Sequence, residues 1–543
     1  MAKEILRYCY INVTKTGWYN LTFNYAVPAF VNTAHTVLMR VYRCTSSEGR
    51  KLVYDRRVSC PAGGGTLASG DVFLLESIPA YLFQGSNVNY KINIEFDDIE
   101  DYGPAGAPGP SDARTITITS NPAPVLKNDV IAVFAPHQDD DTLLFAQTMT
   151  EAVKNNKVAK VVFATNAYHP TVAYRLQEAV NVLTANNLNI PRRDIIFMGY
   201  GDGTTLERAY TSSDPNRIYE SLDNMTRTFG DYPKGLFDFN FLYRNGRQSS
   251  ALPYSRNSIR QDFEDIVKLY KPSEIYTTSV QDSHTDHKTT YNFLNEVLSD
   301  LKISDKTYSP KLNCSIVWGA TSEYPGNTSN TFLNPFAFNG NQNISTKPLV
   351  WQNRVTKILG TGSVTRTDKA SALLAYKSQI SPGSFLSLFA KNDEYYWTKD
   401  FADIAYISKI TRSSENASTG QFAVNAANGV ISGFGDTRLS NDISYKQEWA
   451  VSGGSAGWIK LDFGGMFTVR QINLYDRVNA TDNIMSGRLS FSDGAVVNVG
   501  ALPPGRAKHT VTLSPARNIS WVRFDILSST GPNTGLAEIE VIT

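Results

Sequence analysis

The sequence predicts a chain of three parts, a central parallel α/β domain with a β-sandwich on either side. The first and last parts alternate apolar and polar residues in short runs, which is the period-two pattern of half-buried strands. The middle part alternates continuous apolar runs with helical patterns. A length of 543 residues is enough for about three domains of ordinary size.

The N-terminal β-sandwich is predicted over residues 1–122. Its alternating runs include YINVTKTGWYNLTFNY, VFLLESIPAYLF and YKINIEFDDI, with turn residues between them. The Gly- and Pro-rich segment DYGPAGAPGPSDA, followed by TITITS and NPAP, marks a long loop and the domain boundary.

The central α/β domain is predicted over residues 123–412. Strands buried on both faces that alternate with amphipathic helices indicate a parallel sheet of the Rossmann-like kind, whose ligands bind beyond the carboxyl ends of the strands. The predicted strands are VIAVFAP, KVVFAT, DIIFMGY and SEIYTTS, and the predicted helices are LLFAQTMTEAVKNN, AYRLQEAVNVLTANN and SIRQDFEDIVKLYKP.

The C-terminal β-sandwich is predicted over residues 413–543. Short strands recur at a spacing of about ten residues without a helical stretch. Trp449 and Trp458 are expected in its core. The predicted strands are WIKLDF, VRQINLYDR, GRLSFSD, HTVTL, WVRFDIL and LAEIEVI.

The balance of charge argues against a nucleic-acid or anionic-membrane partner. Lys plus Arg number 52 and Asp plus Glu number 51, which leaves no field of either sign over the whole chain. No apolar run approaches the roughly 20 residues of a membrane helix. The opening MAKEILRYCYINVT lacks the apolar core of a signal peptide, so we expect another export route or a leader outside this sequence. Whether Cys44 and Cys60 bridge a hairpin stays open.

A histidine and three aspartates follow the first predicted parallel strand in IAVFAPHQDDDT. One of these carboxylates would suffice to cap the helix that follows. Three adjacent carboxylates repel one another unless a cation compensates. His137, Asp139, Asp140 and Asp141 therefore indicate a metal site.

A second cluster, SVQDSHTDHKTT, follows the predicted strand SEIYTTS. The chain has only six histidines, and three of them, His137, His284 and His287, fall in these two loops. His137, Asp140 and His287 would form a set of two histidines and one carboxylate, which for zinc leaves the fourth position to water. Asp139 would then be available to take a proton from that water.

The two loops resemble the motifs of the PIG-L/LmbE-like N-acetylglucosaminyl deacetylases. APHQDDD resembles the family's A-H-P-D-D-E motif, SHTDH its H-P-D-H motif, YRLQEAVNVL its R-x-x-E helix and FMGYGDG its Gly-Tyr-x-Asp-Gly turn. The resemblance covers roughly residues 127–300. The departures, Gln138, Asp141 and Thr285, remove no metal ligand.

This resemblance implies a role for each matching residue. His137, Asp140 and His287 bind Zn²⁺ or another divalent transition metal, Asp139 is the general base, and His284 stabilises the tetrahedral intermediate. Arg175, in the R-x-x-E helix, is a substrate contact by the same analogy. The implied reaction is hydrolysis of the acetyl amide of an N-acetylated sugar, such as N-acetylglucosamine, by a metal-bound water.

The C-terminal part resembles discoidin-type, galactose-binding-like β-sandwiches, the fold of many carbohydrate-binding modules. The matching stretches are EWAVSGGSAGWIKLDFGGMFTVRQINLYDR and GLAEIEVI. With a sandwich on each side of the catalytic part, we expect a polymeric or surface glycan as the partner and an extracellular, cell-surface or virion-surface location. Oligomeric state is left open.

Two other interpretations of the chain remain. The same metal set describes the facial triad of non-haem iron oxygenases, although those are usually built on antiparallel barrels. The chain is otherwise a carbohydrate-binding adhesin or virion-surface protein with an inactive or weakly active middle domain. His35, His169 and His509 have no partner motif, and the aromatic run Tyr395, Tyr396 and Trp397 is either core or a sugar platform.

Overall fold

The fold is described from a computed structural model. By its internal contacts the chain forms two compact units, the first of residues 1–130, 149–269 and 375–379, and the second of residues 131–148, 270–374 and 380–543. The structure describes residues 5–11, 17–25, 35–45, 49–60, 65–68, 73–75, 90–96, 116–120, 129–155, 157–166, 172–184, 188–190, 194–222, 224–228, 252–318, 355–358, 366–382, 384–390, 393–436 and 444–543.

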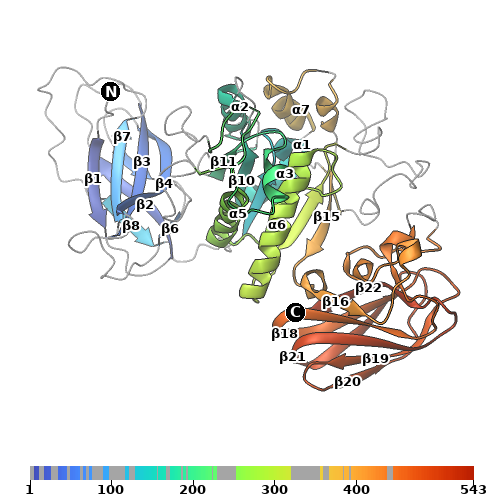
Figure 1. Ribbon diagram of the computed structural model, residues 1–543. Coiled ribbons are helices and arrows are strands. Elements are labelled where there is room, and N and C mark those ends of the chain that lie inside the picture. Colours follow the sequence, from blue (N-terminus) through green and yellow to red (C-terminus); the bar gives the residue numbers. More distant parts are fainter. Residues whose placement is uncertain are drawn as a thin grey trace, which may run out of the picture. The chain divides into compact units, whose positions relative to one another are not determined.

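Antiparallel strands form the N-terminal part of the first unit, as the alternating sequence predicts (Figure 1). One sheet has the order β1-β7-β3-β4, and another has the order β5-β2-β6 with β8 also paired to β2. Met39 and Val41, two residues apart on β3, are both buried, which is the expected period of two. The strands are β1 (Ile5–Ile11), β2 (Gly17–Tyr25), β3 (His35–Thr45), β4 (Gly49–Cys60), β5 (Gly65–Ala68), β6 (Phe73–Leu75), β7 (Tyr90–Phe96) and β8 (Ile116–Ser120).

The hairpin of β3 and β4 decides the question of the cysteines. In its register Cys44 lies opposite Arg50, next to the turn, whereas Cys60 lies opposite His35, at the far end. Bridged cysteines have Cα atoms about 4.4–6.8 Å apart. This register therefore places Cys44 and Cys60 too far along the hairpin to form a disulfide.

Among the described residues, the α/β part of the first unit contains two parallel strands and three helices. The strands β10 and β11 pair in parallel, with Phe163 opposite Phe197 and their rings stacked at 5.1 Å. Consecutive residues of both strands are buried, so each strand is covered on both faces, as its apolar run predicts. The elements are β10 (Val158–Thr165), α2 (Val172–Thr184), β11 (Ile195–Tyr200), α3 (Thr205–Tyr210) and α5 (Arg256–Tyr270).

The α/β part of the second unit has the strand order β9-β12-β13-β15-β14. Strand β12 pairs in parallel with both β9 and β13, whereas β15 pairs antiparallel with β13 and β14. The antiparallel pair at this edge was not predicted. The elements are β9 (Val130–Ala135), α1 (Asp140–Lys154), β12 (Glu274–Thr278), α6 (Thr285–Ser304), β13 (Lys311–Ser315), β14 (Val355–Ile358), α7 (Arg366–Ala375) and β15 (Asp393–Asp400), with the 3₁₀ helix η5 (Leu386–Phe389) before β15.

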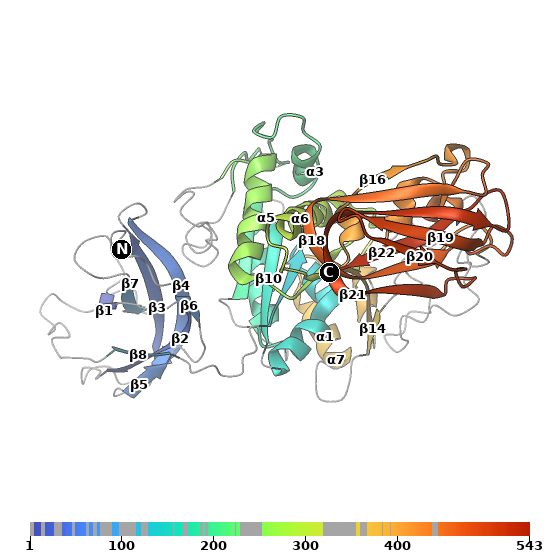
Figure 2. The ribbon, with the colours of Figure 1, turned by 90° about the horizontal axis from the view of Figure 1, so that it is seen from below.

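The C-terminal part of the second unit is an antiparallel β-structure. Four of the predicted short strands are in fact two long ones, β18 and β21, which pair along most of their length (Figure 2). The predicted strands WIKLDF and VRQINLYDR belong to one strand, because β18 continues through Gly464 and Gly465 with a shift of register between Asp462 and Phe467. The strands are β16 (Lys409–Arg412), β17 (Trp449–Ala450), β18 (Gly457–Asp476), β19 (Ile484–Phe491), β20 (Val496–Val499), β21 (Lys508–Ser529) and β22 (Gly535–Ile542), and the 3₁₀ helices are η6 (Ile404–Ile407), η7 (Ala417–Thr419), η8 (Ala423–Ala427) and η9 (Tyr445–Gln447).

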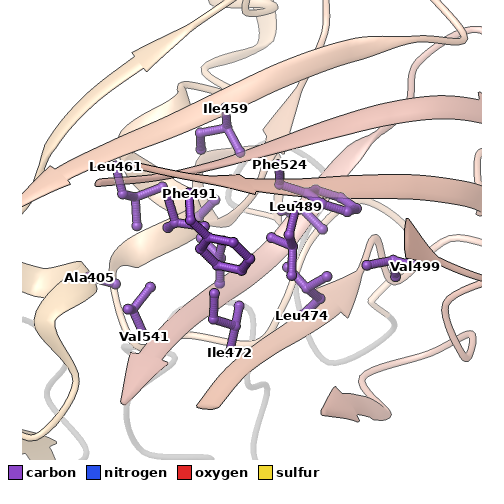
Figure 3. Close-up of a cluster of buried hydrophobic side chains, with 14 of the residues drawn as sticks. Ala405, Ile459, Leu461, Ile472, Leu474, Leu489, Phe491, Val499, Phe524 and Val541 are labelled. Atoms are coloured by element: carbon purple, nitrogen blue, oxygen red, sulfur yellow. The ribbon is translucent and has the colours of Figure 1, made fainter. Parts of the chain in front are cut away.

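A cluster of buried apolar side chains forms the core of this C-terminal part (Figure 3). Leu474, Leu489 and Phe524 meet there from three different strands. Trp449 is buried as predicted, but Trp458 is half-buried and lies beneath the guanidinium of Arg523, 4.4 Å from its ring centre. The prediction that Trp458 is a core residue is therefore wrong, because its strand position faces outward.

The fold class predicted from the sequence is confirmed. Parallel α/β structure in the centre is flanked by antiparallel β-structure at both ends of the chain. Within the part of the chain that the structure describes, no helix is long and apolar enough to span a bilayer. The boundaries near residues 122 and 412 stay predictions.

Candidate metal centre

Two loops that follow neighbouring parallel strands of the second unit carry the predicted site. Because β9 and β12 pair in parallel, their carboxyl ends lie at the same edge. Two threonines near the end of β12 bond to the backbone on either side of the site: the Thr277 hydroxyl donates to the carbonyl of Phe134 on β9 at 2.8 Å, and the Thr278 hydroxyl donates to the carbonyl of His287 on α6 at 3.0 Å. The backbone on each side of the site is thereby held to one strand.

The three side chains predicted as metal ligands meet at this edge. His137 Nδ1 lies 3.2 Å from His287 Nε2 and 3.2 Å from Asp140 Oδ2. His287 Nε2 lies 3.2 Å from the same Asp140 oxygen. All three residues are buried, although Asp140 and His287 come from helices that are distant in sequence.

This triangle of atoms fits a tetrahedral metal ion. A zinc ion with bonds of about 2.0–2.1 Å to nitrogen and oxygen holds its ligand atoms about 3.3 Å apart. Two imidazole nitrogens and one carboxylate oxygen are also a donor set that zinc accepts. The three residues present therefore fit the metal that the sequence implies.

Two further aspartates orient the two histidines. Asp286 Oδ2 lies 3.3 Å from His137 Nε2, and Asp282 Oδ2 lies 2.9 Å from His287 Nδ1. Both carboxylates are fully buried. Metal-binding histidines usually contact such a carboxylate through their second nitrogen, which fixes the ring and the tautomer. Sequence reasoning gave neither aspartate this role, although both stand in the segment VQDSHTDH.

The electrostatics of the site favour a cation. Burial raises the pKa of Asp140, but the charge of His287 and the hydrogen bonds to His137 and His287 outweigh it, so the pKa lies well below its usual range. Burial lowers the pKa of the His287 ring, but the charges of Asp140 and Asp282 prevail and raise it to about 9. Without a metal, His287 holds a proton at neutral pH, and a metal ion would take that proton's place.

His284, predicted to stabilise the intermediate, is the N-cap of α6. Its Nδ1 accepts a hydrogen bond from the backbone N–H of Asp286 at 3.3 Å. In a neutral imidazole this leaves the proton on Nε2, the tautomer that donates a hydrogen bond to a negative oxygen. The His284 ring lies 4.8 Å from that of His137 and 4.7 Å from that of His287, between ring centres.

Asp139, predicted as the general base, lies between the predicted ligands His137 and Asp140 in the chain and is buried. Its N–H donates to the carbonyl of His137 at 3.1 Å, and its own carbonyl accepts from Leu143 in the first turn of α1. Burial raises the pKa of the next residue, Asp141, to about 7, and the negative charges of Asp139 and Asp140 act in the same direction. The hydrogen bond from the Thr142 hydroxyl acts in the opposite direction. This crowding of acids is what the sequence predicted.

Helix α1, which begins with Asp140, is interrupted at Phe145, where φ is −137° and ψ is 21°. A backbone break interrupts the regular hydrogen bonding of a helix, so side chains can bond to the N–H groups that follow it. Glu394 on β15 accepts those of Gln147 and Thr148 at 3.0 and 3.4 Å, and it is itself paired with Lys369 on α7 at 2.9 Å. This buried ion pair therefore fixes α1 just after Asp140, the predicted metal ligand.

Arg175, predicted as a substrate contact, lies on α2 in the first unit. Its guanidinium is 3.6 Å from the carboxylate of Asp202, in the turn after β11, and it also donates to the side chain of Gln379. The two matching stretches of sequence, YRLQEAVNVL and FMGYGDG, thus meet within the first unit. A substrate role for Arg175 stays a proposal.

The remaining candidates are not placed at the site. His169 and the side chains of His35 and Tyr395 lie outside the described residues. His509 lies on β21 opposite Leu474. Tyr396 is buried, with its ring edge-on to Tyr276 at 5.4 Å, so it is a core residue and no sugar platform.

The fold and this site define an α/β domain with a cluster of histidines and aspartates that could hold a metal at the carboxyl edge of its parallel strands. Residues 132–298 match the family model described as GlcNAc-PI de-N-acetylase, PIG-L. This match confirms the predicted resemblance of the central part, and it supports a deacetylase-type enzyme. Residues 403–542 match a second family model, a domain of unknown function, DUF7402.

Solved structures of carbohydrate-binding modules are similar to about a quarter of the chain. The lectin domain of lectinolysin, complexed with Lewis B antigen, is 19% identical over 26% of this chain and 94% of its own, with a TM-score of 0.21. The fucose-binding module SpX-3 of Streptococcus pneumoniae is 19% identical over 26% and 97%, with a TM-score of 0.22. The family 32 module from C. perfringens NanJ, in complex with galactose, is 17% identical over 26% and 98%, with a TM-score of 0.21. Among proteins of curated function, none matches the chain.

Proposed function

We propose that this protein is a hydrolase that removes the acetyl group from an N-acetylated sugar and depends on zinc or a similar divalent metal. The observation that carries the proposal is the triangle of His137, Asp140 and His287 atoms, each 3.2 Å from the other two. The match of residues 132–298 to a de-N-acetylase family supports the amide as the bond that is broken.

His137, Asp140 and His287 would hold the metal. When bound, the ion supplies positive charge that acidifies water and polarises a carbonyl oxygen. Asp286 and Asp282 keep the two imidazoles oriented with a nitrogen toward the ion. The lowered pKa of Asp140 keeps this carboxylate ionised at neutral pH.

Asp139 takes the proton of the attacking water and returns it to the leaving nitrogen. A carboxylate beside the metal ligands is suited to this transfer, which typically contributes about 10²-fold to 10⁴-fold to the rate. His284 donates from Nε2 to the oxygen on which negative charge develops, because its Nδ1 is engaged with the N–H of Asp286. The products are acetate and a free amino sugar.

The test is the release of acetate from a panel of N-acetylated glycans. We expect release by zinc-loaded protein, loss of release after chelation, and recovery when zinc is returned. Release in the absence of oxygen would exclude an iron oxygenase, which uses the same ligand types but consumes O₂. No acetate from any glycan with zinc bound would overturn the proposal and favour the adhesin interpretation.

The same proposal includes a polymeric or surface glycan met outside the cell. Binding domains beside a catalytic domain raise the local concentration of an immobilised substrate. A chain ending before residue 413 should keep its rate on a soluble sugar and lose rate on the polymer. Because Lys302 of α6 donates to the hydroxyl of Thr543, the truncated chain needs a thermal unfolding control. Equal loss on both substrates would count against tethering.

A further inference from the structure

Trp318 lies at the same edge as the metal centre. It follows β13, which pairs in parallel with β12, so the carboxyl end of β13 lies beside the loop that carries His284 and His287. This position was not singled out in the sequence, where Trp318 is one aromatic residue among many.

The backbone of Trp318 is hydrogen-bonded to that loop. Its N–H donates to Asp282 Oδ2 at 3.2 Å, and the same oxygen lies 2.9 Å from Nδ1 of His287. Its carbonyl accepts from the N–H of Ser283 at 2.7 Å and from the Ser283 hydroxyl at 2.9 Å. A single carboxylate thus separates the Trp318 backbone from a predicted metal ligand.

The indole of Trp318 is exposed yet supported. It is 39% exposed, and it stacks on Phe385 with ring centres 5.0 Å apart and an interplanar angle of 24°. Phe385 in turn meets the fully buried Phe389 edge-on at 5.8 Å. Single exposed apolar residues are common on protein surfaces, so exposure alone means little. Trp318 is a different case, because its backbone is bonded to the loop of the candidate metal centre and its ring is stacked on a second aromatic ring, which sets its orientation before a ligand arrives.

We propose that the Trp318 indole is the surface on which the acetylated sugar, or the sugar next to it in the glycan, stacks when its amide enters the metal centre. This inference rests on the proposed function and identifies a substrate-binding residue for it. A pyranose has apolar faces of C–H groups, which pack well on an aromatic ring. Ligand sites combine such apolar surfaces with a few polar groups that fix the orientation, which here are the groups at the metal.

The kinetic test compares Trp318→Ala and Trp318→Phe with the parent protein on an N-acetylglucosamine trisaccharide. We expect the alanine variant to raise KM about tenfold with little change in kcat, and the phenylalanine variant to restore most of the difference. Zinc content should stay constant in both, because the hydrogen bonds to Asp282 and Ser283 are made by the backbone. Ile303→Ala is the matched control, since Ile303 is 37% exposed but lies at the opposite end of α6 from His284 and His287.

A binding test separates this inference from the proposed function. The trisaccharide is titrated calorimetrically into zinc-loaded Asp139→Asn protein with and without Trp318→Ala, which requires no turnover. Weaker binding in the double variant supports the stacking role even if no acetate is released by the parent. Equal affinity, or an unchanged KM in Trp318→Ala, overturns the role of Trp318 and leaves the deacetylase proposal standing wherever the parent releases acetate. Loss of zinc in Trp318→Ala would also overturn it, since the residue would then be structural.

Discussion

Replacing Asp282 by asparagine should weaken metal binding without unfolding the protein. Oδ2 of Asp282 lies within hydrogen-bond distance of His287 Nδ1 and accepts from the N–H groups of Val317 and Trp318, whereas Oδ1 accepts from the N–H of His284. Asparagine has one acceptor oxygen. It keeps three of the four contacts by placing that oxygen at the Oδ2 position.

The magnitude follows from what is lost. The NH₂ of asparagine then faces the His284 N–H, which costs about 1–3 kcal/mol in the free energy of unfolding. Loss of the carboxylate behind a ligand histidine typically weakens metal affinity about 10-fold to 100-fold, or about 1.4–2.7 kcal/mol. The charge of Asp282 also helps to raise the pKa of His287 to about 9. In the variant this pKa is lower, so the proton that zinc must displace from His287 is bound less tightly. The loss of zinc affinity relative to the parent should therefore be largest near pH 9 and smaller near pH 7.

The assay is competition for zinc with a chromophoric chelator, repeated between about pH 7 and pH 9. The matched control is Asp305→Asn at the other end of α6, where the exposed pair with Lys271 is removed and zinc affinity should not change. Equal affinity of Asp282→Asn and parent at pH 9 would refute the view that Asp282 supports a metal ligand. A deficit that does not vary with pH would refute the proton competition at His287.

Three further outcomes are expected. Asp139→Asn should retain zinc by elemental analysis while its rate of acetate release falls about 10²-fold to 10⁴-fold, and loss of zinc would mean that Asp139 is a ligand. Lys369→Met should lower the free energy of unfolding in urea by about 3–5 kcal/mol because it leaves the Glu394 carboxylate buried and unpaired, and adding Glu394→Gln should recover part of this loss. Burial raises the pKa of Asp403 to about 8, so the stability that this group contributes at acid pH should be lost between about pH 4 and pH 8. Asp403→Asn mimics the neutral acid and should make the melting temperature fall less over this range. An unchanged dependence of the melting temperature on pH would contradict the raised pKa of Asp403.

The sequence was sufficient for the elements that carry the site. VIAVFAP and SEIYTTS are short apolar runs, and strands buried on both faces have that pattern whatever packs against them. His137, Asp140 and His287 followed from their residue types, since imidazole and carboxylate groups gathered after two predicted strands form the donor set of a metal ion. The parallel pairing of β9 and β12 then brings them together.

The residues that support the predicted metal ligands could not be predicted from the sequence, for a physical reason. Asp282 and Asp286 stand next to the motif, but an aspartate at a helix start is more often a cap, and only the ring orientations reveal which nitrogen each one faces. Glu394 acts on α1 from a strand almost 250 positions later, a pairing that no local pattern encodes. The pair Gly464 and Gly465 separates the predicted strands WIKLDF and VRQINLYDR, but glycine weakens a strand without always ending it, and β18 runs through both residues.

The position of His284 allows an experiment to separate its role as the N-cap of α6 from its proposed role as a hydrogen-bond donor in the reaction. One nitrogen of its ring belongs to the helix, because it accepts the N–H of Asp286 and so organises the turn from which His287 projects. Asparagine is among the best N-cap residues, and its side-chain oxygen would accept the N–H of Asp286 in place of the ring nitrogen. It has no imidazole N–H to offer an anion. Any slowing in a His284→Asn protein would thus report the proton on the far nitrogen alone, while alanine would confound that effect with a frayed helix.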